Sequence, residues 1–193
     1  MEKHKLILMA EEKFAREVTL GVIVTRPLSV WRNIIPGMFI FDFLSREGAL
    51  RKYTEYFLFP RKLAIDAVQA LARGEEKTAV FSHIEQETTG WLNSLKLHTP
   101  GLLQAQLAVT KLLVEHYAKL LKEDGYSVYA LIKKAYENRV NFEGFIKELT
   151  AAEAEVDRER IAKMGETEKL KAKIEAEQKQ IKERRETILQ EVF

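Results

Sequence analysis

Apolar residues recur three or four positions apart along almost the whole chain, and no strand pattern stands out. The spacing is clearest over residues 102–123, and the turn-forming pair Asp124-Gly125 follows it. Pro60 is expected to end one helix or to open the next. The sequence therefore predicts an all-α fold, an irregular helical bundle. The further helices are expected over residues 3–24, 49–59, 61–73, 75–97 and 127–138, and from 141 onward.

The composition changes at about residue 150. Beyond this point about half of the residues are charged, and aromatic residues are absent until Phe193. We therefore expect a helical bundle domain over residues 1–149 and a long, charged, extended helix over residues 150–193, which either folds back on the bundle or projects from it.

This charged region carries a thin apolar stripe. Three of its isoleucines are seven residues apart, but Glu177 and Arg184 occupy the positions where a coiled coil needs a second apolar stripe. A self-sufficient coiled coil is therefore not expected. A second chain could complete the stripe, so we expect a homo-oligomer or a protein partner to contact Leu170, Ile174, Ile181 and Ile188.

The overall composition permits a buried core but points to no particular ligand. Hydrophobic residues make up 46% of the 193 residues and charged residues 31%, which is typical of globular proteins. The net charge of +2 is too small to indicate nucleic acid. The chain has no cysteine, which excludes disulfides, thiolate catalysis and cysteine-ligated metal centres. No signal-peptide pattern is found at the N-terminus, so we expect a cytoplasmic protein.

Catalytic motifs are missing. No G-x-S-x-G motif occurs, and the nine glycines form no phosphate-binding loop. No histidine follows a glutamate at the spacing of helical di-metal sites, and the pair His83 and Glu87 fits a surface contact better than a metal site. We therefore predict no catalytic residue, no cofactor, no metal and no identifiable small-molecule substrate.

The apolar segment over residues 27–45 departs from the charged surroundings. Its core, residues 33–44, is too short to cross a bilayer, and Arg32 and Asp42 would make a span costly. Pro36-Gly37 bends it. Two interpretations remain open: a central core helix of the bundle, or a helix that enters one leaflet of a membrane. The residues expected to contact a membrane or a partner here are Trp31, Ile34, Ile35, Phe39, Ile40, Phe43 and Leu44.

Basic residues follow the apolar segment. Residues 1–62 hold 11 lysines and arginines against 7 acidic residues, and such an excess suits anionic headgroups. The candidate headgroup contacts are Arg46, Arg51, Lys52, Arg61 and Lys62. Aromatic residues between these bases could stack on nucleic-acid bases, but their core-like spacing and the nearby glutamates favour a core role, so no nucleic-acid partner is predicted.

The string Pro27-Leu28-Ser29-Val30-Trp31, followed by Ile34-Ile35-Pro36, resembles a segment of a small group of bacterial proteins that have no assigned activity. The resemblance covers mainly the first seventy residues. It implies a bacterial protein with a role close to a membrane, and it implies no site residue.

Together these observations predict a non-enzymatic helical accessory or scaffold protein, docked through residues 33–44 on the inner face of the cytoplasmic membrane. The alternative is a soluble interaction module that recruits its partner through the C-terminal helix. A helical enzyme or a nucleic-acid-binding protein has less support in the sequence.

Overall fold

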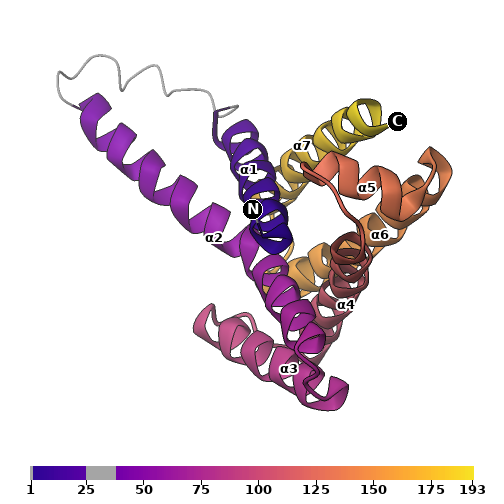
Figure 1. Ribbon diagram of the computed structural model, residues 1–193. Coiled ribbons are helices and arrows are strands. Elements are labelled where there is room, and N and C mark those ends of the chain that lie inside the picture. The colour runs from indigo at the N-terminus through magenta and orange to yellow at the C-terminus, as the bar shows by residue number, and fades with distance from the viewer. Residues whose placement is uncertain (1, 25–37) are drawn as a thin grey trace.

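The computed structural model describes residues 2–24 and 38–193, and these residues form helices joined by short connections (Figure 1). The all-α prediction is confirmed: seven helices pack against one another, and the described residues contain no strand. They are α1 (Lys3–Val24), α2 (Met38–Ala72), α3 (Lys77–Ser94), α4 (Pro100–Lys122), α5 (Val128–Tyr136), α6 (Arg139–Met164) and α7 (Glu168–Val192).

Helix starts follow local chemistry. The side chains of Thr99, Ser127, Asn138 and Thr167 each accept a hydrogen bond from a backbone N–H in the first turn of α4, α5, α6 and α7, respectively. The helix start predicted at residue 127 is thus confirmed. The expected start at Asn141 is wrong by one turn, because Asn138 accepts the N–H of Asn141 and so caps the helix three residues earlier.

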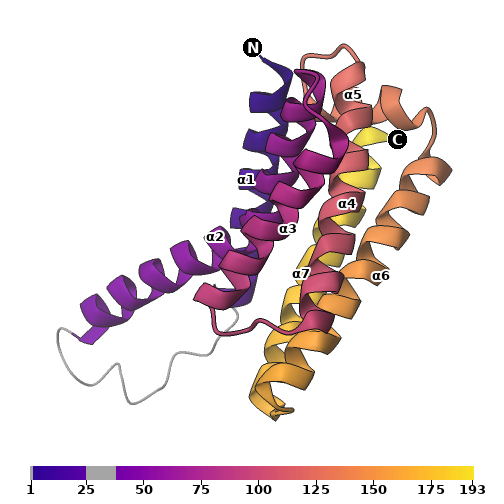
Figure 2. The same cartoon turned by 90° about the horizontal axis from the view of Figure 1, so that it is seen from below.

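Helix α2 corrects the expectation at Pro60. The helix runs through this proline instead of ending there. A proline inside a helix removes one backbone hydrogen bond, but Phe57, Leu58, Leu63 and Ala64 are buried on either side of it. Burial of both flanks outweighs the lost bond. Figure 2 shows that the axis of α2 changes direction along its length, a bend that prolines commonly cause.

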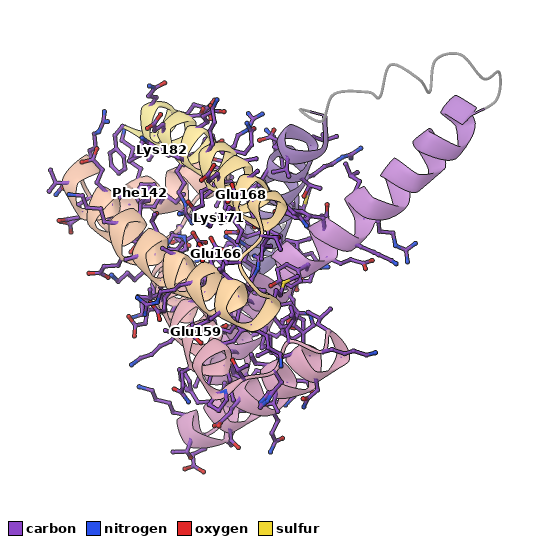
Figure 3. The ribbon with its side chains drawn as sticks, turned by 180° about the vertical axis from the view of Figure 1, so that it is seen from behind. Phe142, Glu159, Glu166, Glu168, Lys171 and Lys182 are labelled. Carbon is purple, nitrogen blue, oxygen red and sulfur yellow. The ribbon has the colours of Figure 1, made fainter. Side chains whose placement is uncertain are left out.

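The C-terminal region is helical and charged, as predicted, but it is not one continuous helix from residue 150. Helix α6 passes through position 150 and ends at Met164, and Gly165 then adopts a left-handed φ of 83°. Glycine is the residue that takes this conformation without strain. Helix α7 then turns back and runs antiparallel to α6, so the two lie side by side in Figure 3, with Glu166 at the connection.

The core lies along α4, which contacts α2, α3, α5 and α6. Its side chains Leu102, Leu113, Tyr117 and Leu120 are fully buried. Helix α7 packs on α1 and α5 as well as on α6, which closes the bundle on the side opposite α3 (Figure 1). The last helix of the chain therefore covers the first.

Candidate functional site

The first part of α2 projects away from the bundle. This is visible from three directions, in Figures 1, 2 and 3. The first side chains of α2 with described contacts to other helices are Tyr53, which lies 5.0 Å from Lys173 of α7, and Thr54, which bonds Thr19 of α1. We call residues 38–52, which precede these contacts, the α2 arm.

The α2 arm contains part of the apolar segment singled out in the sequence. Phe39, Ile40, Phe43, Leu44 and Arg46 belong to this helical part, and their side chains lie outside what the structure describes. The other three apolar candidates lie outside the described residues altogether; they are Trp31, Ile34 and Ile35.

The predicted basic contacts divide into two groups. Arg51, Lys52 and Lys62 are exposed, with Arg51 paired to Glu55 and Lys62 to Glu12 at the surface. Arg61 is not: only 4% of it is exposed. The expectation that Arg61 meets headgroups is therefore wrong, because its position in α2 faces the interior. Phe57, one of the aromatic residues between these bases, is also buried, as the core interpretation predicted.

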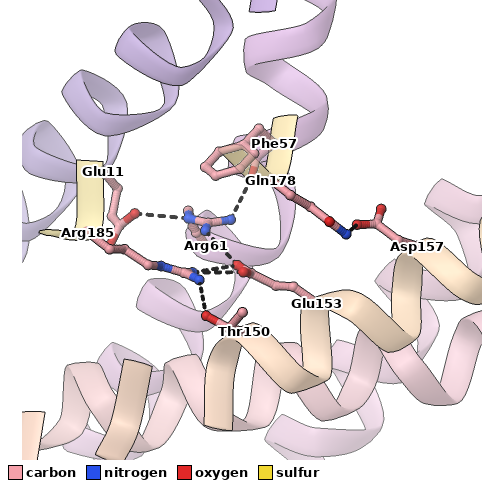
Figure 4. Close-up of polar contacts among 8 residues, drawn as sticks. All are labelled: Glu11, Phe57, Arg61, Thr150, Glu153, Asp157, Gln178 and Arg185. Atoms are coloured by element: carbon pink, nitrogen blue, oxygen red, sulfur yellow. Dashed lines mark hydrogen bonds and ion pairs between the residues drawn. The ribbon is translucent and has the colours of Figure 1, made fainter. Parts of the chain in front are cut away.

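Arg61 is the centre of a buried ion-pair network (Figure 4). Its Nε donates to Glu11 of α1 at 3.0 Å, and its Nη2 donates to Glu153 of α6 at 3.2 Å. Its Nη1 donates to the carbonyl oxygen of Phe57 at 3.1 Å, and the guanidinium lies 3.8 Å from the centre of the Phe57 ring. Burial disfavours the charge, but the two carboxylates outweigh it and raise the pKa of Arg61.

Arg185 extends the network to α7. Its Nη2 lies 2.9 and 2.8 Å from the two oxygens of Glu153, and its Nη1 donates to the hydroxyl oxygen of Thr150 at 2.7 Å. Glu153 thus bridges two arginines, as Figure 4 shows. Two arginines and two glutamates from four helices compensate one another in the interior, an arrangement that buried charges require.

A second buried polar cluster joins α6 and α7. Arg160 lies 3.2 Å from Asp157 on its own helix and 3.8 Å from Glu177 of α7. Gln178 donates to Asp157 at 2.9 Å (Figure 4). Burial raises the pKa of Glu177 although Arg160 acts in the opposite direction. The cluster fixes the position of α7 on α6.

The apolar stripe of α7 is covered by the chain itself. Ile174 and Ile181 are buried, and Ile181 packs with Val18, Phe57 and other residues of α1 and α2. Ile188 packs against the main core, and Leu170 is half-buried. The chain itself therefore already buries Ile174 and Ile181, and contact of the stripe with a second chain stays a prediction.

Neither His83 nor His116 belongs to a group of metal-ligating side chains within the described residues. His83 is exposed on α3. His116 is buried, with Nδ1 2.8 Å from the hydroxyl oxygen of Tyr136 and its ring stacked 4.3 Å from Phe145. Burial, and secondly the charge of Lys119, lowers the pKa of His116 to about 3. His116 is thus a neutral core side chain at ordinary pH.

The described residues contain neither a membrane-spanning helix nor a metal-binding cluster. Across residues 2–24 and 38–193, no helix is both long and apolar enough to cross a bilayer. Within the same ranges, no three acidic or histidine side chains gather as a metal site requires. Comparison with known protein families, curated proteins and solved structures found no match to this chain.

Sequence reasoning missed the two polar clusters, although the pattern contained a signal. Arg61 follows Phe57 by four residues and precedes Ile65 by four, so it lies on the buried face of α2. In α7, Arg185 lies four residues after Ile181, and this arginine, not Arg184, continues the buried face. A charge placed at the spacing of core residues indicates a buried partner on another helix.

Proposed function

We propose that the protein is a non-enzymatic helical scaffold that attaches to an anionic membrane surface through the α2 arm. The observation that supports this most directly is the projection of the arm, which carries an apolar sequence away from the bundle core (Figures 1 and 2). A helix that only filled the core would lie among the other helices.

The arm has the composition of an interfacial helix. Phe39 and Phe43 are four residues apart, as are Ile40 and Leu44, so these four side chains share one side of the helix. Apolar faces of this kind lie in the headgroup region of a bilayer, parallel to the surface. Arg51 and Lys52, both exposed, follow at the end of the arm, where they can meet anionic headgroups.

The bundle supplies a rigid support for the arm. The arm continues into the part of α2 that holds Arg61, and the ion pairs of Arg61 tie this part to α1 and α6. An arm that enters a membrane would therefore carry the whole bundle with it. The exposed surfaces of the other helices then remain free for the components that a scaffold gathers.

Vesicle co-sedimentation tests the attachment. The full chain should sediment with vesicles rich in phosphatidylglycerol at low salt, and less with neutral phosphatidylcholine vesicles or at high salt. The double variant Phe39→Glu with Phe43→Glu should remain in the supernatant, because two carboxylates on the apolar face oppose both burial and anionic lipid.

The matched control places the same two charges elsewhere. Met9 and Val140 are exposed on α1 and α6, so Met9→Glu with Val140→Glu adds equal charge outside the arm. This control should sediment almost as the unmodified chain does. If the unmodified chain stays in the supernatant with anionic vesicles, or if the arm variant sediments as well as the control, the proposal is wrong.

A further inference from the structure

A cavity of about 330 Å³ lies between α1, α4, α5, α6 and α7. Protein interiors rarely hold empty spaces larger than a water molecule, and this volume lies within the range of small-molecule pockets. Residues 38–52 contribute nothing to its described lining, so the α2 arm does not account for it. The cavity therefore points to a ligand of its own.

The inner wall of the cavity is mainly apolar. The buried side chains that form it include Ile7, Leu113, Tyr117, Ile132, Phe142 and Leu149. The half-buried side chains of Phe145, Ile146 and Ile188 extend this wall to positions that solvent reaches. Such a surface, which continues from the interior to the solvent, suits an apolar chain that enters from outside. The ligand therefore needs a long apolar part.

The arginines of the lining already have partners. Arg61 and Arg185 belong to the buried network described above, in which two glutamates compensate them. Arg184, which is half-buried, lies 3.6 Å from Glu17 of α1. None of the three arginines therefore needs a ligand to compensate its charge.

Lys13 of α1 is different. It is exposed and lines the cavity, so it lies where the cavity meets the solvent. It forms no ion pair with the residues that the structure describes, whereas Glu191 accepts a hydrogen bond from the Tyr129 hydroxyl. Four basic and three acidic side chains line the cavity within the described part of the chain, a surplus of one positive charge. The mouth thus favours an anionic group.

The start of α5 adds to this preference. Ser127, Val128 and Tyr129 line the cavity, and Ser127 caps the N–H of Ala130. The N–H groups of Val128 and Tyr129 have no partner within the helix, and the positive end of the helix dipole favours a negative charge. Lys13 and the start of α5 thus supply positive potential from two different helices.

We propose that this cavity binds a fatty acid, with its hydrocarbon chain among the apolar side chains and its carboxylate at the mouth beside Lys13 and the start of α5. The carboxylate keeps its contact with water there, so the charge is not buried without a partner. This binding does not rest on membrane attachment, and either can fail without the other.

The probe is decanoate, titrated into the isotopically labelled full chain and followed by heteronuclear NMR. Decanoate should give saturable shifts at residues lining the cavity, such as Ile7, Ile146 and Ile188. The variant Phe39→Glu with Phe43→Glu should bind decanoate as the unmodified chain does, because the α2 arm contributes nothing to the described lining. This comparison separates the cavity from the membrane contact.

Two related molecules test the chemical class. Octanoate should bind about tenfold more weakly than decanoate, because each buried methylene group contributes a factor of about three to four. Decyltrimethylammonium has the same chain length and the opposite charge, and should bind at least about fivefold more weakly than decanoate.

A pair of alanine substitutions locates the hydrocarbon chain. Ala10 lines the cavity from α1, so Ala10→Leu should fill part of it and weaken decanoate binding by about tenfold or more. Ala108 is exposed on α4 and does not line the cavity, so Ala108→Leu should bind decanoate as the unmodified chain does.

A pair of lysine substitutions locates the carboxylate. Lys13→Gln removes the charge at the mouth and should weaken decanoate binding roughly two- to fivefold, while the binding of uncharged 1-decanol stays the same. Lys163 is exposed on α6 and does not line the cavity, so Lys163→Gln is the matched control and should leave both affinities unchanged.

Four results would overturn the proposal. The absence of saturable shifts at the cavity residues would refute the site. Equal decanoate affinity in Ala10→Leu and Ala108→Leu would show that the hydrocarbon chain binds elsewhere. Equal affinities for decanoate and decyltrimethylammonium would refute the anionic class. Equal decanoate affinity in Lys13→Gln and Lys163→Gln would show that the carboxylate does not lie at this mouth.

Discussion

At the scale of single residues, the most consequential side chains are the charges that the core encloses. Arg61, Arg160 and Arg185 are each less than a tenth exposed. A buried ion pair adds little stability compared with an apolar pair, but removal of one partner leaves the other charge uncompensated. These arginines therefore specify how the helices are arranged, because Arg61 reaches both carboxylates only when α1 places Glu11 and α6 places Glu153 beside it.

Substitution of Arg61 should test this compensation. Arg61→Met leaves Glu11 without its arginine and should lower the free energy of unfolding by about 3–5 kcal/mol, as measured by urea denaturation. The neighbouring Lys62 is exposed and lies 3.7 Å from Glu12, so Lys62→Met should change the same quantity by less than about 1 kcal/mol. Similar losses in the two variants would contradict the role assigned to the network.

His116 should make the bundle sensitive to acid. Its pKa is about 3 in the folded chain and about 6.5 in an unfolded one, so only the unfolded state takes up the proton between these values. Its contribution to stability is thus complete above pH 6.5 and is lost as the pH falls, at up to about 1.4 kcal/mol per pH unit. In His116→Asn this contribution is absent.

The measurement is urea denaturation of both proteins between pH 7 and pH 4. The stability difference between the unmodified chain and His116→Asn should shrink or reverse as the pH falls. Other titrating groups, such as Glu177, act in both proteins and cancel in the difference. Parallel pH profiles would show that His116 takes up its proton in the folded state.

At the scale of the elements, two backbone positions show whether a helix continues or ends. Helix α2 continues through Pro60 because burial on both sides holds it together. The long charged region is instead divided at Gly165, whose φ of 83° turns the chain back toward α1. Hydrophobic spacing alone predicts neither outcome, since both depend on contacts with distant helices.

Two glycine substitutions in the same region should have opposite effects. Gly165→Ala forces a side chain into the left-handed region and should lower the free energy of unfolding by about 1 kcal/mol. Gly144 lies within α6 with open space beside it, so Gly144→Ala should raise the same quantity by up to about 1 kcal/mol. Chemical denaturation measures both, and a shift of the same sign in the two variants would refute the assignment of the turn.

At the scale of the whole molecule, α7 is part of the core. Its side chains Ile174, Ile181, Leu189 and Val192 are buried. Its Arg185 forms an ion pair with Glu153 of α6. The chain therefore folds as one set of mutually dependent helices in the residues described, with α7 packed on α1, α5 and α6.

A truncated chain should show this dependence. Removal of residues 166–193 uncovers the apolar faces of α1 and α2 and takes away Arg185, so the remainder should lose its cooperative thermal transition and bind a hydrophobic dye. Circular dichroism and dye fluorescence measure both properties. A shortened chain that melts cooperatively close to the full-length temperature would show that residues 1–165 fold alone.

How far the sequence predicted the structure depends on the range of the interactions. Helix starts at Thr99 and Ser127 follow from local capping and were predictable. The burial of Arg61 depends on Glu11 and Glu153, which are 50 and 92 positions away. The covering of Ile181 by α1 and α2 depends on residues more than a hundred positions away. A single sequence displays the spacing of such residues but not which helix faces them. The cavity beside Tyr117 is a property of packing and leaves no mark in the spacing.

The bridge formed by Glu153 has a consequence for the synthesis of the chain. Its two arginines come from positions 61 and 185, so the second is synthesised 32 residues after Glu153. A nascent chain holds the first arginine and the glutamate while the last helix is still inside the ribosome. Closure by Arg185 must therefore wait until α7 has emerged, and a product that ends before α7 would expose apolar side chains of α1 and α2 to chaperones and proteases.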